Sequence, residues 1–118
     1  MDPLRRQLTD PSLKGLAEVV DLLRLMDREV PAQVVATFLY VAMHEGCHKS
    51  ALEEDLNMTN ASGSRNTDWL TAQHRLNKPG LDLIIKEVDP TNRRRTTLRL
   101  SNKVKALINR FKDALYGD

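Results

Sequence analysis

Three consecutive arginines, Arg93, Arg94 and Arg95, follow Asp89 and Pro90 and form the densest positive charge in the sequence. Adjacent like charges repel one another unless an anion neutralises them. Asp, Pro, Thr and Asn favour turns, so we expect the arginines at a loop tip, where they have no apolar surface to cover. Guanidinium groups bind phosphate through charge-assisted hydrogen bonds. The triplet therefore predicts a phosphate-binding tip; a solvated basic loop or a contact for an acidic protein are the alternatives.

A second group of hydrogen-bonding side chains begins at Thr59, which can cap a helix. The DNA major groove accepts a helix whose first turns carry small or polar side chains, and Arg65 adds a bidentate donor for guanine. Gly63 costs such a helix about 1 kcal/mol relative to alanine, which a close approach to DNA or to a neighbouring helix would explain. An ordinary solvated helix face is the alternative. The other candidate DNA-binding residues here are Asn60, Ala61, Ser62, Ser64 and Asn66.

The remaining reactive side chains predict no catalytic or metal site. His44, Cys47 and His48 offer three ligands, whereas a structural zinc site needs four. Cys47 is the only cysteine, and an inert thiol is favoured over a redox switch because no second cysteine can resolve an oxidised form. Asp68 and the acidic run at 53–55 fit solvated helix charges. Because no Gly-rich phosphate loop or catalytic-serine motif occurs, we expect neither an enzyme nor a cofactor.

Composition and charge fit one small domain. The 118 residues are 41% hydrophobic and 29% charged, which allows a core without disulfides. Residues 1–59 hold 6 basic and 10 acidic residues, a net −4, whereas residues 60–118 hold 12 and 6, a net +6. A basic half is typical of nucleic-acid binding, although basic residues that solvate helix faces would give the same balance. No leader-like or membrane-spanning run occurs, which predicts a cytoplasmic protein without membrane contact.

Hydrophobic spacing predicts the helices at the start of the chain. Residues 10–28 repeat apolar side chains at steps of three and four behind a cap at Asp10, with apolar groups on more than one side of the helix. Such a helix is either central in its own domain or packed on a partner chain, and we expect a partner. A buried central helix is predicted from Pro31 to Gly46, where a left-handed residue ends it.

The next segment predicts a helix-turn-helix. Ser50 and Glu53 suit a capping box for a short helix over residues 50–56. Asn57 tolerates the left-handed turn that follows, and Thr59 caps a second helix that runs to residue 73. Two short helices joined by a tight turn have this architecture.

A β-hairpin and a last helix complete the prediction. Ser101 is expected to cap the helix at 101–116, whose apolar residues again repeat at steps of three and four. The preceding residues alternate, with one apolar face on each strand. These faces are formed by Leu81, Leu83 and Ile85, and by Thr96, Leu98 and Leu100.

Helix-turn-helix, hairpin and helix is the winged-helix order, and three segments resemble the MarR family of winged-helix regulators. DPTNRRRTTLRLSNKVKALI is similar to the family's wing and following helix, PAQVVATFLYVA to its central helix, and LEEDLNMTNASGSRNTDWL to its helix-turn-helix. The resemblance covers about residues 30 to 110 and is greatest to the short versions carried by bacterial viruses. Glu53, Asn92 and Val104 depart from the pattern, standing where alanine, aspartate and glycine are usual.

The predicted fold class is mainly α with a small β-hairpin wing. One domain would comprise an N-terminal dimer helix (10–28), a winged helix-turn-helix core (31–100) and a C-terminal dimer helix (101–116). Surplus apolar surface on the first and last helices predicts a homodimer, and the resemblance implies the same. The expected dimer contacts are Leu16, Val20, Leu23, Ile108, Phe111 and Leu115.

The resemblance implies a sequence-specific regulator of transcription that binds an inverted repeat in double-stranded DNA. It places Arg94 in the minor groove, with Arg93 and Arg95 on phosphates or internal partners. Two alternatives stay open. A protein-interaction module could bind a host protein through the basic surface, and a single-strand binder would need more aromatic residues than the two Tyr, two Phe and one Trp present.

Overall fold

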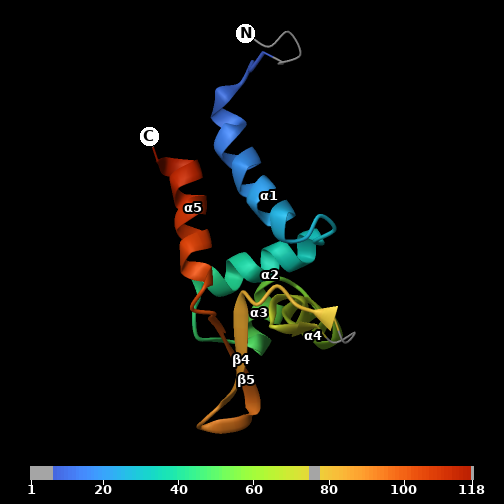
Figure 1. Ribbon diagram of the computed structural model, residues 1–118. Coiled ribbons are helices and arrows are strands. Elements are labelled where there is room, and N and C mark those ends of the chain that lie inside the picture. The colour runs from blue at the N-terminus through green and yellow to red at the C-terminus, as the bar shows by residue number, and fades with distance from the viewer. Residues whose placement is uncertain (1–6, 75–77, 118) are drawn as a thin grey trace.

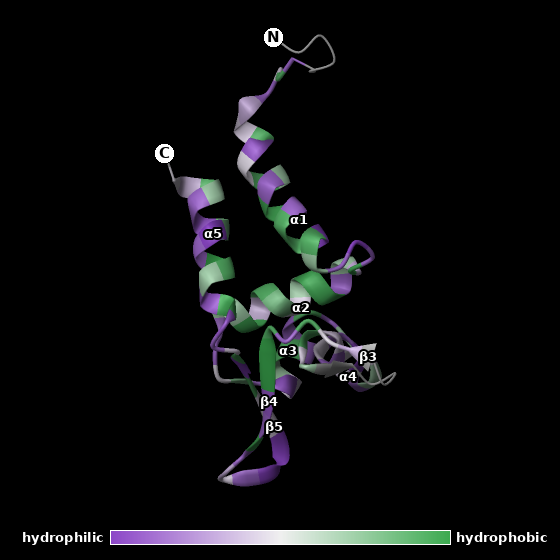
Figure 2. Cartoon of the chain, in the orientation of Figure 1, coloured by the Kyte–Doolittle hydropathy of each residue, from purple (hydrophilic) through white to green (hydrophobic). Residues whose placement is uncertain are grey.

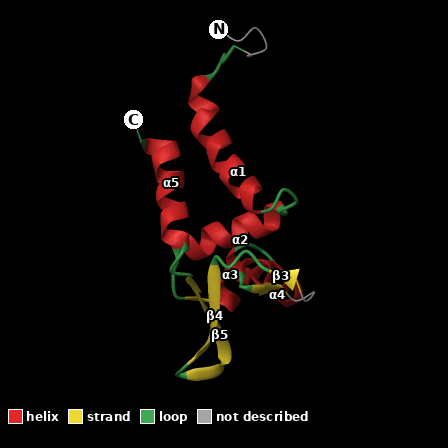
Figure 3. Cartoon of the chain, viewed as in Figure 1, coloured by secondary structure: helices red, strands yellow, loops and turns green. Residues whose placement is uncertain are grey.

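Figure 1 shows the computed structural model of the protein, which describes residues 7–74 and 78–117. Over this part of the chain it contains five α-helices and a small three-stranded antiparallel sheet. The first and last helices lie at one end of the molecule and a long β-hairpin projects from the other, with the remaining helices between them (Figure 3).

The first helix begins as predicted, behind Asp10. The Asp10 side chain accepts a hydrogen bond from the backbone N–H of Ser12 and caps a single 3-10 turn, Pro11–Leu13. Helix α1 (Lys14–Met26) continues from that turn. Leu22 and Leu23 are buried on it, so the C-terminal half of α1 belongs to the core of the chain.

Helix α2 (Ala32–Met43) is the buried central helix that the sequence predicts. Val34, Phe38 and Val41 are almost completely shielded from solvent. The helix ends earlier than predicted, because Gly46 takes its φ of 90° in the following loop and not at the helix end.

The helix-turn-helix consists of α3 (Lys49–Asp55) and α4 (Asn60–Leu70). The turn forms as predicted: Asn57 has a φ of 55°, and the Thr59 hydroxyl accepts a hydrogen bond of 3.1 Å from the backbone N–H of Ser62. The α2 and α3 helices are joined by a hydrogen bond of 2.5 Å from the Tyr40 hydroxyl to Asp55, which raises the pKa of Tyr40 to about 12.

The predicted capping box of the first short helix is wrong. Helix α3 starts at Lys49, so Ser50 already lies within its first turn, and no side chain caps its N-terminus. Glu53 pairs with Lys49 instead. The backbone begins the helix earlier because Cys47 and His48 are held as a short strand, which the sequence pattern did not indicate.

The sheet has the strand order β1-β5-β4 and is antiparallel throughout. Its strands are β1 (Cys47–His48), β4 (Ile84–Asp89) and β5 (Asn92–Leu100). A separate pair, β2 (Gln73–His74) and β3 (Lys78–Pro79), lies between α4 and the hairpin in the sequence.

The predicted apolar face of the first hairpin strand is out of phase by one residue. Ile84 lies opposite Leu100 and Lys86 opposite Leu98, so these residues share a face and Ile85 points to the other side. Asp82, with a φ of 57°, interrupts the extended backbone before the strand begins. Leu98 and Leu100 are buried as predicted.

Helix α5 (Val104–Tyr116) begins later than predicted and without a side-chain cap. The Ser101 hydroxyl donates to the backbone carbonyl of Asp82 instead, so the expected N-cap is wrong. The helix packs on α1, where an added Cβ at Gly15 would lie 3.2 Å from the carbonyl carbon of Ala114. Helix α2 and parts of α1 and α5 are hydrophobic, whereas the hairpin tip is hydrophilic (Figure 2). None of the described helices combines the length and apolar character needed to cross a membrane.

Candidate nucleic-acid interface

The N-terminal half of α4 presents the polar side chains that the sequence singled out. Thr59, Asn60, Ala61 and Arg65 are exposed, and the structure places them on the first two turns of the helix. The other three predicted residues are half-buried: Ser62, Ser64 and Asn66.

Hydrogen bonds within α4 organise this surface. The Thr59 hydroxyl, which caps the helix, also donates a hydrogen bond of 3.1 Å to the Ser62 hydroxyl. The Arg65 guanidinium donates a hydrogen bond of 3.1 Å to the same Ser62 oxygen. A guanidinium has five N–H donors, so Arg65 retains most of them for an external acceptor.

Asn66 is directed toward the interior of the helix-turn-helix. Its side-chain amide donates a hydrogen bond of 3.4 Å to the sulfur of Met58, which packs against the core. The buried Thr67 hydroxyl donates a hydrogen bond of 2.7 Å to the backbone carbonyl of Gly63. Asn66 therefore serves the packing of the turn against α4 more than the outer surface of the helix.

The tip of the β4–β5 hairpin is fixed by Asp89. Its carboxylate accepts hydrogen bonds from the backbone N–H of Thr91 at 2.9 Å and from the Thr91 hydroxyl at 2.8 Å. His48 on β1 lies 2.9 Å from the other carboxylate oxygen. The two bonds from Thr91 and the contact with His48 lower the pKa of Asp89 to about 2. The hairpin tip is thus tied both to its own turn and to the strand on the far side of β5.

The three arginines occupy an irregular part of β5. Asp89 is paired with Asn92 and Val88 with Thr96, so residues 93–95 fall in the register shift between these two pairs. All three arginine side chains are exposed. The Asn92 side chain accepts a hydrogen bond of 3.1 Å from the backbone N–H of Arg94, which holds the turn.

Charge pairing separates these arginines from the other basic residues of the hairpin region. Lys86 pairs with Asp68 of α4, Arg99 with Glu87 across the hairpin, and Lys103 with Asp82. The Arg99 contact lowers the pKa of Glu87 through a hydrogen bond of 2.9 Å. By contrast, over residues 7–74 and 78–117 no carboxylate lies within ion-pair distance of Arg65 or of residues 93–95. This part of the surface has positive charge available for an external anion.

Comparison with known proteins identifies the arrangement. No protein-family model and no curated protein matches the sequence. Among solved structures, the chain is similar to the Staphylococcus aureus MepR–DNA complex, with a TM-score of 0.65 and 19% identity over 84% of this chain and 74% of that one. It is also similar to MarR, with a TM-score of 0.55 and 24% identity over 88% and 80% of the two chains. A third similar structure is the PcaV transcriptional regulator of Streptomyces coelicolor, solved with its natural ligand. Its TM-score is 0.58 and its identity is 18%, over 93% of this chain and 78% of that one.

The chain has the winged-helix fold. The predicted fold class is therefore confirmed: five helices, of which α3 and α4 form the helix-turn-helix, with the β4–β5 hairpin as the wing.

The winged helix contains two contacts that sequence reasoning missed. His48 braces the wing through Asp89, and Lys49 joins α3 to the first residue of α4. The turn residues around Asp89 were visible in the sequence, but nothing nearby indicated that a histidine 41 positions earlier would meet them. Lys49 and Glu53 have the i, i+4 spacing of a helical ion pair, which was the available signal.

The predicted dimer residues divide into two groups. Leu23 and Phe111 are only 7% and 6% exposed, and Phe111 packs edge-on against Phe38 with ring centroids 6.2 Å apart. These two residues stabilise the core of the chain itself, which corrects their assignment to a partner surface. The remaining four are exposed or half-buried: Leu16, Val20, Ile108 and Leu115.

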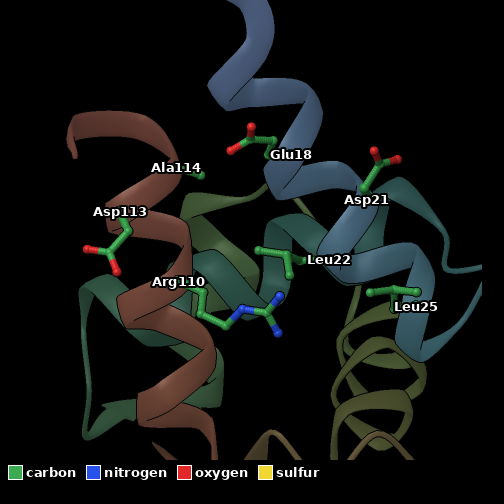
Figure 4. Close-up of a pocket in the computed structure, with 7 residues that line it drawn as sticks. All are labelled: Glu18, Asp21, Leu22, Leu25, Arg110, Asp113 and Ala114. Atoms are coloured by element: carbon green, nitrogen blue, oxygen red, sulfur yellow. The ribbon is translucent and has the colours of Figure 1, made fainter. Parts of the chain in front are cut away.

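An open pocket of about 500 Å³ is lined by residues of α1 and α5 (Figure 4). Arg110 extends from α5 into this space toward Leu22 of α1. The polar groups that line the pocket are three carboxylates and this guanidinium, so its charge is unlike that of the wing. Its lining residues are Glu18, Asp21, Leu22, Leu25, Arg110, Asp113 and Ala114.

Cys47 lies apart from both surfaces, in β1. Burial raises the pKa of its thiol, which lowers the fraction present as reactive thiolate. Among the described residues, no three His, Cys, Asp or Glu side chains gather closely enough to hold a metal ion.

Proposed function

We propose that this protein is a transcription regulator that binds double-stranded DNA sequence-specifically as a homodimer. The observation that carries the proposal is that Arg93, Arg94 and Arg95 of the wing have no carboxylate partner among the described residues and lie on the same molecule as a helix-turn-helix whose α4 exposes polar side chains. The Lys86–Asp68 pair joins β4 to α4 and so fixes the wing relative to that helix. The protein acts by binding, without catalysis or a cofactor.

Helix α4 is the recognition helix in this proposal. An α-helix fits the major groove of B-DNA, and residues of its N-terminal turns reach the base edges. Arg65 donates two hydrogen bonds to guanine, while Ser62 orients its guanidinium. Thr59, Asn60, Ala61 and Ser64 lie around it and make the remaining contacts.

The wing supplies the affinity that does not depend on sequence. Arg94 enters the minor groove, where a narrow groove concentrates negative potential, and Arg93 and Arg95 meet phosphates. The register shift suits this role because the bulged strand turns away from the regular ladder of the sheet at these residues.

The dimer forms through the apolar surface of α1 and α5. Leu16 is 56% exposed, and Val20 and Leu115 are also exposed, although each is large and apolar. An apolar groove of about 470 Å³ between α1 and α2 extends this surface; Val20, Val35 and Leu39 contribute to it. A second copy of the chain would cover this face and place the two recognition helices roughly 34 Å apart, one turn of DNA.

The solved structures support this function. MepR was crystallised with DNA, and PcaV is described as a transcriptional regulator. The uninterrupted SRN of α4 and the loop HRLNKPG favour the short regulators of bacterial viruses, acting in the cytoplasm of the host; residues 75–77 of that loop lie outside the described residues.

A titration with random duplex DNA at several salt concentrations tests the proposal against the alternative of a host-protein adaptor. A protein that contacts phosphates releases counterions, so the logarithm of its affinity falls steeply with the logarithm of the salt concentration. We expect such a slope. Absence of duplex binding even at low salt would favour the adaptor.

A further inference from the structure

Glu53 lies in the interface between α3 and α4, in a position that depends on Gly63. Gly63 is buried in the middle of α4. An added Cβ there would lie 2.6 Å from Cγ and 2.7 Å from Cδ of Glu53, distances that real Cβ atoms do not show. The carboxylate therefore occupies the space that any other residue at position 63 would take.

Lys49 holds this carboxylate in place from the same helix. The Lys49 ammonium group pairs with Glu53 Oε2, and the two side chains are only 13% and 12% exposed. A half-buried carboxylate without a cation would be unfavourable, so Lys49 and Glu53 stabilise each other in the interface.

Lys49 also reaches the first residue of α4. Its ammonium group donates a hydrogen bond of 2.8 Å to Oδ1 of Asn60 and lies 3.4 Å from the Asn60 backbone carbonyl. Lysine has donors only, so the amide oxygen of Asn60 must face it and the amide nitrogen must face away. Within the part of the chain that the structure describes, that nitrogen has no acceptor.

This arrangement limits what Asn60 can recognise. An asparagine that reads adenine uses its oxygen and its nitrogen together. The oxygen of Asn60 keeps a second lone pair, but it faces the Lys49 ammonium group, so the group that faces away from Lys49 and can meet DNA is the amide donor. Phosphate oxygens accept from asparagine amides and supply the largest share of protein–DNA hydrogen bonds.

We infer that Lys49, held by Glu53 in the space left by Gly63, is a positioning residue that presents the Asn60 amide to a DNA phosphate. This inference rests on the proposed function. Lys49 does not itself touch DNA in this arrangement, because its three donors face Glu53 and Asn60 and its side chain is only 13% exposed.

A double-mutant cycle tests whether Lys49 acts through Asn60. Lys49→Met and Asn60→Ala should each weaken binding about five- to tenfold, as loss of one hydrogen bond does. The double variant should bind as Asn60→Ala does. Multiplied losses, or no loss in Lys49→Met, would overturn the inference. Lys49→Met leaves the Glu53 carboxylate unpaired, so Lys49→Met/Glu53→Gln is measured beside it as a variant with a neutral pair.

Two further readouts separate positioning from direct contact. The salt slope of Lys49→Met should equal that of the unmodified chain; a slope smaller by about one unit would show that Lys49 binds phosphate itself. The loss in Asn60→Ala should be equal on a selected duplex and on an unrelated one. A loss confined to the selected duplex would mean a base contact and overturn the assignment to phosphate.

Thermal unfolding tests the packing of Glu53 on Gly63 without DNA. Gly63→Ala improves helix propensity, so it should raise the midpoint when Glu53 is alanine and should not raise it when Glu53 is present. An equal rise in both backgrounds would overturn the close approach. If the unmodified chain binds no duplex, the proposed function and the role of Asn60 fail together. The thermal unfolding of these variants still tests the packing of Glu53 on Gly63, because it does not require DNA.

Discussion

Arg65 and the arginines at positions 93–95 differ in what surrounds them, and the proposed function gives them different roles for this reason. Arg65 lies on a rigid helix and is oriented by the Ser62 hydroxyl at 3.1 Å. The wing arginines follow a turn held by Asp89 and are exposed over the whole bulge. A fixed guanidinium suits readout of a base, whereas three long exposed side chains beside a turn suit phosphate or groove shape.

Arg65→Ala should remove specificity and spare general affinity. Loss of a bidentate contact with guanine costs about 1 to 3 kcal/mol on the correct base. Titrations of a selected duplex and a scrambled one at the same salt concentration measure the two effects. Equal losses on both would make Arg65 a phosphate contact, and no loss on either would remove α4 as the recognition helix.

Asp89→Asn should destabilise the wing at neutral pH. The pKa of Asp89 is about 2 in the folded chain and 3.8 as its ordinary value, because Thr91 and His48 stabilise the carboxylate. Its contribution to the free energy of unfolding is therefore present above about pH 4 and is lost as the pH falls through 2. Urea unfolding from pH 2 to pH 7 should show a difference between the two chains that shrinks on acidification. Asp113→Asn, on exposed α5 surface, is the control; the same pH-independent change in both variants would contradict this role of Asp89.

At the scale of elements, local chemistry could be predicted and non-local pairing could not. The cap at Thr59 and the left-handed Asn57 depend on neighbouring residues alone, and both form as predicted. Strand β1 exists because it pairs with β5 some fifty residues later, with Cys47 opposite Leu98. The phase of β4 depends on the interruption at Asp82, which alternation in the sequence did not reveal.

The difference between local chemistry and non-local pairing also explains which parts of the candidate site could be predicted from the sequence. The residues of α4 and the wing could be found because their types and order carry the chemistry. The contact of His48 with Asp89 and the fit of Glu53 against Gly63 depend on how β1 meets the hairpin and how α3 meets α4. Burial of Phe111 likewise depends on the approach of α5 to α2. The helical spacing of Phe111 shows that it lies on an apolar face, but not whether that face packs on the same chain or on a partner.

Phe111→Ala should destabilise the chain itself. The ring is nearly buried against Phe38, and removing such a side chain costs about 3–5 kcal/mol. Lys112→Ala, an exposed neighbour on the same helix, should change the free energy of unfolding by less than about 0.5 kcal/mol. Chemical denaturation measures both; similar small changes would show that α5 does not pack on the core as described.

Arg94→Ala should weaken binding to every duplex and reduce the salt slope. Counterion release predicts that the slope falls by about one unit for each phosphate that the protein no longer neutralises. Lys112→Ala removes the same charge from α5, away from the wing, and should leave the slope unchanged. If Arg94→Ala changes neither affinity nor slope, the wing does not touch DNA.

At the scale of the whole molecule, two features lie at opposite ends. The wing projects from one end, and α1 and α5 extend at the other, where Leu16, Val20 and Leu115 are exposed (Figure 1). Separation of an apolar surface from a basic surface would allow two chains to associate without covering the groups that meet DNA in the proposed function. The charge asymmetry of the sequence does not follow this division, since the wing and α5 both belong to the basic half although they lie at opposite ends.

Leu16→Glu should convert a micromolar dimer to a folded monomer. The residue is exposed in the single chain, so the charge disturbs association and not the core. Leu25→Glu is the matched control: this residue is 79% exposed on the same helix but about 180° away around its axis. Sedimentation of the three chains should show monomer for Leu16→Glu alone. A well-folded monomer at all concentrations of the unmodified protein would contradict the dimer.

Selection of bound duplexes from a random-sequence library tests the central claim most directly, because it requires base readout, phosphate binding and dimer geometry together. We predict enrichment of an inverted repeat whose half-sites lie about 10 base pairs apart, centre to centre. Loss of that enrichment in Arg65→Ala would assign the readout to α4. A bound pool that stays as random as the starting library would contradict sequence-specific recognition by this winged helix.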